Sequence, residues 1–129
     1  MKKYIFFVIA ILTVLLVPGC GSPSEGEDIE IKPAPIHGVN ISFAKSLPPQ
    51  VIVYIKGGLP DGCTTFRELK TERTGKTVKI TVTVQRPKEA ICTEIYGFFE
   101  RNENLGSDFT RGETYTVIVN DISKTFVMQ

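Results

Sequence analysis

Apolar and polar residues alternate along much of the chain, most strictly between Thr77 and Gln85. The apolar positions of this stretch recur at every second residue, at Val78, Ile80, Val82 and Val84. Most of its residues are β-branched, which favours extended backbone because such side chains pack well on a pleated surface. The pattern therefore predicts a strand with one buried and one solvated face.

Further extended runs occur along the chain, and glycine and proline turns separate them. Several alternate in the same way, whereas residues 51–55 are apolar on both faces, which suits a strand covered on both sides. These runs cover residues 29–31, 38–43, 51–55, 92–101, 114–120 and 125–128. No stretch shows a convincing helical period. Roughly seven or eight short strands in about 100 residues indicate an all-β fold and favour an immunoglobulin-like antiparallel β-sandwich.

Two segments lack a clear period. Residues 66–73 fit either one helical turn or a polar edge strand, and residues 102–111 are typical of a polar loop. Tyr115 stands near the start of a late alternating run, which makes it a candidate tyrosine corner. Phe126 and Met128 are expected to point inward.

The N-terminus is typical of a targeting segment. Two lysines follow Met1, and fourteen mostly apolar residues then run from Tyr4 to Val17. This run is shorter than the roughly 20 residues that a spanning helix needs, and it fits a secretory signal. The following Pro18-Gly19-Cys20 resembles a bacterial or archaeal lipobox, which implies that Cys20 is lipidated and becomes the new N-terminus. An ordinary signal peptide or an uncleaved anchor is the alternative.

These features divide the chain into a lipoprotein signal peptide at residues 1–19, a tether at 20–28 and a folded domain at 29–129. The tether is small, polar and acidic, so we expect it to be flexible. A diacylglyceryl group on Cys20 provides the two acyl chains that stable anchoring requires. We therefore expect a lipid-anchored protein on the cell membrane, facing away from the cytoplasm.

The charge of the chain is nearly balanced. Its 129 residues contain 15 basic and 14 acidic side chains, a formal charge of +1. Removal of Lys2 and Lys3 with the signal peptide makes the balance slightly negative. This charge balance provides no electrostatic attraction to nucleic acid, so we expect no nucleic-acid partner.

Three cysteines leave one unpaired in a secreted protein. Lipidation of Cys20 would account for the odd number of cysteines and leave Cys63 and Cys92 to form a disulfide. Closing a loop of about 30 residues would stabilise the fold by roughly 3 kcal/mol. Free buried thiols are the alternative in a reducing compartment. Metal binding is disfavoured because His37 is the only histidine and no Cys-x-x-Cys spacing exists.

Several short motifs together resemble a family of uncharacterised prokaryotic secreted and lipoprotein domains. They are Gly58–Thr64, Arg86-Pro87, Ala90–Thr93, Phe99-Glu100 and Gly112–Asn120, and the likeness runs from about residue 39 to 126. The family has cysteines where Cys63 and Cys92 stand, which supports their pairing. No activity is attached to the family, so the likeness implies fold and location only. Residues 105–110 depart from the family's Leu-Pro turn, which leaves the shape of that loop open.

No set of residues predicts catalysis, so we expect no enzyme and no cofactor or metal. His37 lies near Pro35 and Gly38 in a predicted turn, where an exposed loop residue is expected rather than a general base. The carboxylates are scattered without a glycosidase or phosphate-binding signature, at Glu68, Glu72, Glu94, Glu100, Glu103 and Asp108. Asn40 begins a glycosylation triplet, but it falls inside a predicted strand.

The favoured function is a surface-tethered binding module for an envelope or extracellular protein. Loops at the ends of a β-sandwich are its usual contact surface. The candidate loops are residues 60–66, 86–90 and 102–111. Their candidate contact residues are Asp61, Thr64, Arg86, Lys88, Asp108 and Arg111.

A proteinase inhibitor with an immunoglobulin-like fold is the alternative. Some bacterial inhibitors of cysteine proteinases present Gly-Gly and Arg-Pro loops, and this chain has Gly57-Gly58 and Arg86-Pro87. The Asn-Pro-Thr-Thr-Gly loop of those inhibitors is missing, and the order of the loops differs.

Overall fold

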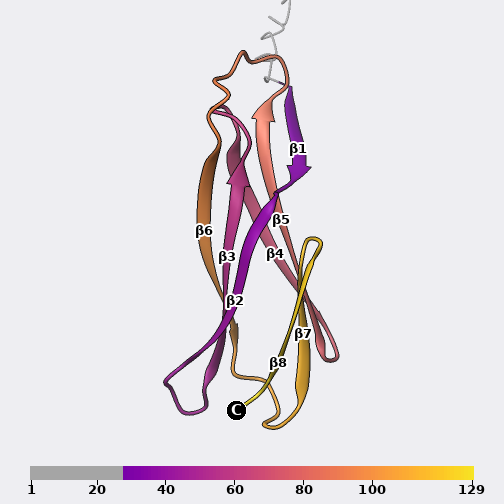
Figure 1. The fold of residues 1–129 in the computed structure, drawn as a ribbon. Coiled ribbons are helices and arrows are strands. Elements are labelled where there is room, and N and C mark those ends of the chain that lie inside the picture. Colours follow the sequence, from indigo (N-terminus) through magenta and orange to yellow (C-terminus); the bar gives the residue numbers. More distant parts are fainter. Residues whose placement is uncertain (1–27) are drawn as a thin grey trace, which may run out of the picture.

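The computed structural model describes residues 28–129, which form eight β-strands in two sheets (Figure 1). The strands are β1 (Ile29–Pro33), β2 (Ile36–Ala44), β3 (Gln50–Leu59), β4 (Thr65–Thr74), β5 (Thr77–Pro87), β6 (Gly97–Gly106), β7 (Thr114–Val119) and β8 (Ile122–Val127). The predicted signal peptide, Cys20 and nearly all of the tether lie outside the described residues. Residues 28–129 contain no helix that is long and apolar enough to cross a membrane.

The larger sheet is built around β5, the strand with the strictest alternation. It pairs with β4 along nearly its whole length, so β1 and β7 share its other edge. β1 lies beside residues 83–87 of β5, β7 lies beside residues 77–80, and β8 lies outside β7. The β5–β7 pairing is parallel, whereas every other strand pairing among the described residues is antiparallel.

Asn120 closes the gap between β1 and β7 along the edge of β5. Its Oδ1 accepts a hydrogen bond from the amide of Val82 at 2.8 Å, and its Nδ2 donates to the carbonyl oxygens of Val82 and Ala34. Its φ of 51° lies in the left-handed region, which asparagine tolerates better than most residues. One side chain therefore supplies the hydrogen bonds that a strand would otherwise provide.

The smaller sheet has the order β2-β3-β6 and packs on the larger one. The largest fully buried side chains come from alternating positions of β3, β5 and β7, namely Val51, Val53, Ile55, Val78, Ile80, Val82, Val117 and Val119. Phe126 and Met128 are buried as expected, at 8% and 3% exposure. The prediction of an all-β sandwich with seven or eight strands is confirmed.

Two segments differ from the sequence expectation. Residues 102–106 belong to β6 rather than to a loop, and β6 begins at Gly97 rather than at residue 92. Arg101 and Glu103 are paired with the buried Ile55 and Val53, so they stand on the same face of the sheet as these core residues and hide the strand's period. Ile95, which falls in the run 92–101 that was expected to be extended, is 71% exposed because residues 88–96 cross from one sheet to the other outside the strand ladder.

Residues 66–73, for which the sequence allowed one helical turn or a polar edge strand, belong to the edge strand β4. It is joined to β5 by a tight turn, in which Gly75 has a φ of 60°. Glycine adopts this left-handed conformation without steric cost.

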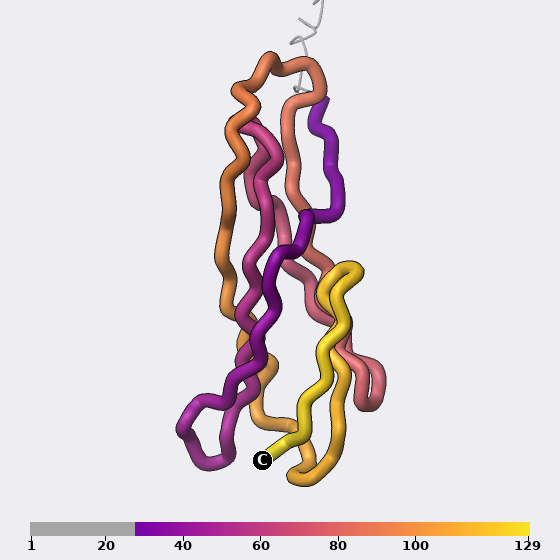
Figure 2. The backbone as a smooth tube through the Cα atoms, in the orientation of Figure 1, coloured from indigo at the N-terminus to yellow at the C-terminus, as the bar shows by residue number. Residues whose placement is uncertain are grey.

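Most of the loops lie at two opposite ends of the elongated sandwich, whereas the β7–β8 turn lies about half-way along it (Figures 1 and 2). The tether end consists of Asp28, residues 60–64 and residues 88–96, and the amide of Lys88 donates to the carbonyl oxygen of Asp28 at 2.8 Å. The distal end consists of residues 45–49 and 107–113, and the C-terminus lies there too. The three predicted contact loops are therefore divided between the two ends.

Candidate functional site

The loops of the tether end are cross-linked by the Cys63–Cys92 disulfide. The two cysteines have Cα atoms 5.5 Å apart and are separated by 29 positions. The pairing predicted from cysteine count and family likeness is confirmed, and the bond joins two loops at one end of the sandwich. The amide of Gly62 also donates to the carbonyl oxygen of Thr93 at 2.8 Å. Both loops are therefore fixed to one another.

Asp61 organises the turn that precedes Cys63. Its Oδ1 accepts hydrogen bonds from the amides of Cys63 and Thr64 and from the hydroxyl of Thr64, each at 2.9 Å. Its Oδ2 lies 3.4 Å from Nη1 of Arg86. The other guanidinium nitrogen, Nη2, donates to the carbonyl oxygen of Ala90 at 3.1 Å. One carboxylate thus links the loop after β3 to the end of β5.

The surroundings of Asp61 act on its pKa in opposite directions. Burial raises the pKa, but the Thr64 hydroxyl, the Cys63 amide and the Arg86 guanidinium stabilise the charged form. The lowering effects prevail, so the pKa of Asp61 lies below its usual range. The folded protein therefore favours the ionised carboxylate.

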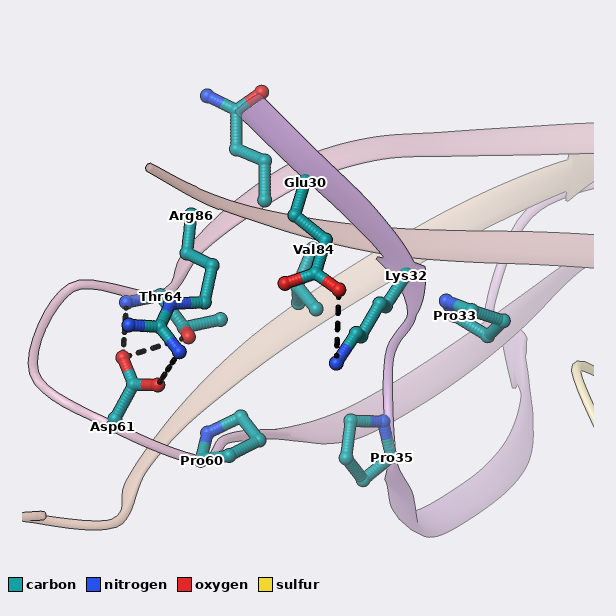
Figure 3. A pocket seen from close by; sticks show the side chains of 10 residues that line it. Glu30, Lys32, Pro33, Pro35, Pro60, Asp61, Thr64, Val84 and Arg86 are labelled. Carbon is teal, nitrogen blue, oxygen red and sulfur yellow. Dashed lines mark hydrogen bonds and ion pairs between the residues drawn. The ribbon is translucent and has the colours of Figure 1, made fainter. Parts of the chain in front are cut away.

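A cavity of about 170 Å³ lies beside this network, between β1, β5 and the loop after β3 (Figure 3). Its charged side chains are paired, since Glu30 lies 3.2 Å from Lys32 and Asp61 lies beside Arg86. The cavity is smaller than the roughly 300–1,000 Å³ typical of ligand pockets. These features favour a structural role for it.

Asp61, Cys63 and Cys92 place potential metal-ligand atoms within 4.8 Å of one another. A cysteine ligates metal as a thiolate, and both of these sulfurs are bonded to each other. The group is therefore a disulfide with a neighbouring carboxylate rather than a metal site in this structure.

The predicted contact residues fall into two groups. Asp61, Thr64 and Arg86 lie together at the tether end, where their polar atoms bond to one another, and Lys88 is exposed nearby. Asp108 and Arg111 are exposed at the distal end. The first three residues maintain the fold, so the exposed groups left for a partner are Lys88, Asp108 and Arg111.

The distal loop 107–113 is held in place by Tyr115. Its hydroxyl oxygen accepts a hydrogen bond from the amide of Thr110 at 2.7 Å, which matches the geometry expected for a tyrosine corner. The ring packs edge-on against Phe109, with centroids 4.9 Å apart, and stacks on Phe126. The loop is thereby attached to the core through an aromatic cluster.

Arg73, on β4, also holds the loop 107–113 in place. This residue was not identified from the sequence. Its Nη1 donates to the carbonyl oxygen of Asp108 at 2.5 Å, and its guanidinium lies 4.3 Å from the ring centroid of Phe109. The chain gives no local signal for this role because Arg73 belongs to β4, far from the loop in sequence.

A groove of about 300 Å³ lies between the two loops of the distal end. It is lined by Leu47, Pro48, Pro49, Ser107, Phe109, Arg111, Met128 and Gln129. Leu47 is 100% exposed and Arg111 is exposed, so an apolar side chain and a cation are both free to contact a partner.

His37 lies within β2 rather than in the predicted turn, although it is exposed as expected. Its Nε2 is hydrogen-bonded to the hydroxyl of Tyr96, and Phe98 packs edge-on beside it. A Cβ on Gly58 would lie 2.0 Å from the Tyr96 hydroxyl oxygen, so this glycine makes room for the pair. The cluster is a surface contact between β2 and the start of β6.

The Gly57-Gly58 pair on which the inhibitor alternative rests does not form a loop. Both glycines are buried within β3, and Gly57 lies beneath the ring of Phe99. Arg86-Pro87 forms the last two residues of β5. The arrangement therefore gives no structural support to that alternative.

Comparison with known proteins yields relatives of the folded domain. The chain is 44% identical over 89 residues to an uncharacterized 10.2 kDa protein in the HgiCIIM 5' region of Herpetosiphon aurantiacus, covering 69% of this chain and 94% of the relative. It is 46% identical over 79 residues to a second such protein, in the HgiBIM 5' region of the same organism, covering 61% and 95%. No solved structure matches significantly. Residues 53–128 match the ORF11 beta-sandwich domain, and the chain belongs to this family of β-sandwich domains.

Proposed function

We propose that this protein is a lipid-anchored lipoprotein facing away from the cytoplasm, and that its β-sandwich binds an envelope or extracellular protein. Cys20 would carry the lipid, and the distal end would carry the contact surface. The observation that carries the binding proposal is the distal loop, which is fixed to the core while Leu47 and Arg111 remain exposed beside the groove.

The anchor is supported by the sequence before Asp28 and by the chemistry of the domain. A lipobox-like Cys20 follows an apolar signal. The Cys63–Cys92 disulfide is the kind of bond that persists in oxidising compartments. Asp28 lies at the tether end, so an anchor entering there leaves the distal end free for a partner.

The distal end is suited to binding because its loop is already ordered. Binding costs conformational entropy when a loop must be fixed, and a preformed loop avoids much of that cost. Tyr115 and Arg73 fix residues 107–113 through their contacts with Thr110 and Asp108. The exposed Leu47 supplies apolar area, and Arg111 supplies charge-assisted hydrogen bonds.

The binding proposal is tested with a matched pair of charge reversals. Full-length wild type, Arg111→Glu and Lys88→Glu are each used to capture partners from envelope extract, and quantitative mass spectrometry compares the recovered proteins. We expect a specific partner with wild type and Lys88→Glu, and its loss with Arg111→Glu. Equal recovery with all three proteins would place the contact elsewhere.

The anchor is tested by fractionation of cells that express wild type or Cys20→Ser. Wild type is expected in the membrane fraction and in the detergent phase of a phase separation. The serine variant is expected to leave that phase, since a hydroxyl does not form the lipobox thioether. Retention of the variant in the membrane fraction would indicate an uncleaved anchor instead.

A further inference from the structure

We propose that the tether end rests on the lipid bilayer, with Ile91 and Ile95 of the β5–β6 connection inserted among the lipid headgroups and upper acyl chains. This inference rests on the proposed lipid anchor and adds a second, non-covalent contact with the membrane. It gives the domain a fixed orientation with the distal end pointing outward.

The two isoleucines are unusually exposed for large apolar residues. Ile91 is 102% exposed and Ile95 is 71% exposed, and Tyr96 beside them is 43% exposed. Aliphatic side chains gain free energy when they leave water, and tyrosine favours the membrane–water interface. Adjacent exposed apolar residues on one connection therefore favour a contact surface.

The backbone that carries Ile91 is held on both sides. The carbonyl oxygen of Ala90 accepts from Arg86, and Cys92 is bonded to Cys63. The carbonyl oxygen of Thr93 accepts from Gly62. The isoleucine thus projects from an ordered segment, so its insertion would require little additional ordering of the chain.

The position of the tether identifies the bilayer as the occupant. The amide of Lys88 donates to the carbonyl oxygen of Asp28, so the chain enters the domain beside this connection (Figure 1). The eight residue steps from Cys20 to Asp28 span at most about 29 Å even when fully extended. A lipid on Cys20 would therefore keep Ile91 close to the membrane at a high effective concentration.

The charge of the connection favours insertion by apolar contact rather than attraction to anionic lipid. Lys88 is accompanied by Glu89 and Glu94, all three of which are exposed. Their charges sum to a negative value, so anionic lipid would offer no gain. Contact is therefore expected to be no stronger in vesicles that contain anionic lipid than in zwitterionic vesicles.

The absence of tryptophan from the chain provides a direct test. Ile91→Trp and Leu47→Trp each create a single fluorescent reporter in the full-length lipidated protein, one at either end of the domain. Leu47 is 100% exposed, so it is a matched control for the tendency of tryptophan to enter interfaces. Both variants are reconstituted into phosphatidylcholine vesicles with brominated acyl chains, and into vesicles that also contain phosphatidylglycerol.

We expect blue-shifted emission and strong bromine quenching for Ile91→Trp, with water-like and weakly quenched emission for Leu47→Trp. Flotation of the same samples shows whether the protein is attached to the vesicles, and it does so independently of the fluorescence. Floating protein with equally weak quenching at both positions would overturn the inference and leave the anchor intact. Protein that does not float would refute the anchor and this inference with it. A blue shift that grows with protein concentration without vesicles would identify a second copy as the occupant, against the proposal.

Discussion

Asp61 uses both of its carboxylate oxygens within the fold. One oxygen accepts three hydrogen bonds from Cys63 and Thr64, and the other faces Arg86. A residue chosen from the sequence as a partner contact therefore maintains the tether end. Loop residues of this kind are polar for structural reasons, because they satisfy backbone amides that no strand can satisfy.

The charge of Asp61 makes stability depend on pH. Its folded pKa is lowered, so its contribution is present above the unfolded pKa of roughly 3.9 and is lost as pH falls through the folded value. Asp61→Asn is expected to be less stable than wild type at neutral pH, with the difference disappearing in acid. Urea denaturation across that range measures this. Asp108→Asn, at a fully exposed carboxylate, is the control, and an equal pH effect there would contradict the assignment.

Close packing makes Gly57 sensitive to a single methyl group. A Cβ at this position would lie 2.1 Å from Cζ of the buried Phe99, whereas a Cβ on Gly38 would have its nearest neighbour at 3.7 Å. Gly57→Ala is expected to lower the free energy of unfolding by roughly 1–3 kcal/mol through overpacking. Gly38→Ala should cause no loss. Chemical denaturation of the two variants compares them, and equal stabilities would show that Phe99 moves freely.

At the scale of elements, strands with a strictly alternating pattern were predictable and polar ones were not. β5 and β7 bury one face against the opposite sheet, so their periods are visible in the sequence. β4 and β6 are edge strands with polar residues on the core side of their sheets, such as Arg73, paired with Val78, and Arg101, paired with Ile55, and these residues hide the pattern. The parallel pairing of β5 with β7, and Asn120 in the gap beside it, depend on distant segments that leave no local signal.

The disulfide constrains the loops after β3 and β5. Replacing both cysteines, in Cys63→Ala/Cys92→Ala, is expected to lower the free energy of unfolding by roughly 3 kcal/mol. The expected cause is the larger entropy of an unfolded chain without the cross-link. Denaturation of wild type in the presence of a reductant should give a similar value. Unchanged stability in both experiments would show that the bond constrains little.

Tyr115 connects β7 to the distal loop. Tyr115→Phe leaves the amide of Thr110 without its acceptor, so we expect a loss of about 1 kcal/mol in unfolding free energy. The control is Tyr54→Phe, which removes an exposed hydrogen bond to Glu100 and should cost less. Thermal unfolding ranks the two variants, and a larger effect at Tyr54 would contradict the tyrosine corner.

At the scale of the whole molecule, the sandwich has two ends with different roles in our proposal. The sequence predicted three contact loops but not which of them share an end, because that depends on how the strands cross between the sheets. The fold brings Asp61 and Arg86 together although they lie far apart in the chain. It also separates both of them from Arg111, which lies beside the distal groove.

We propose a protein that is lipidated on Cys20 and carries the disulfide between Cys63 and Cys92. Intact-mass spectrometry of the protein extracted from the membranes of its host cell, followed by fragmentation, tests both modifications at once. We predict a chain that begins at Cys20, carries diacylglycerol and lacks the two thiol hydrogens of the other cysteines. A chain that begins at Met1 with three free thiols would contradict the account.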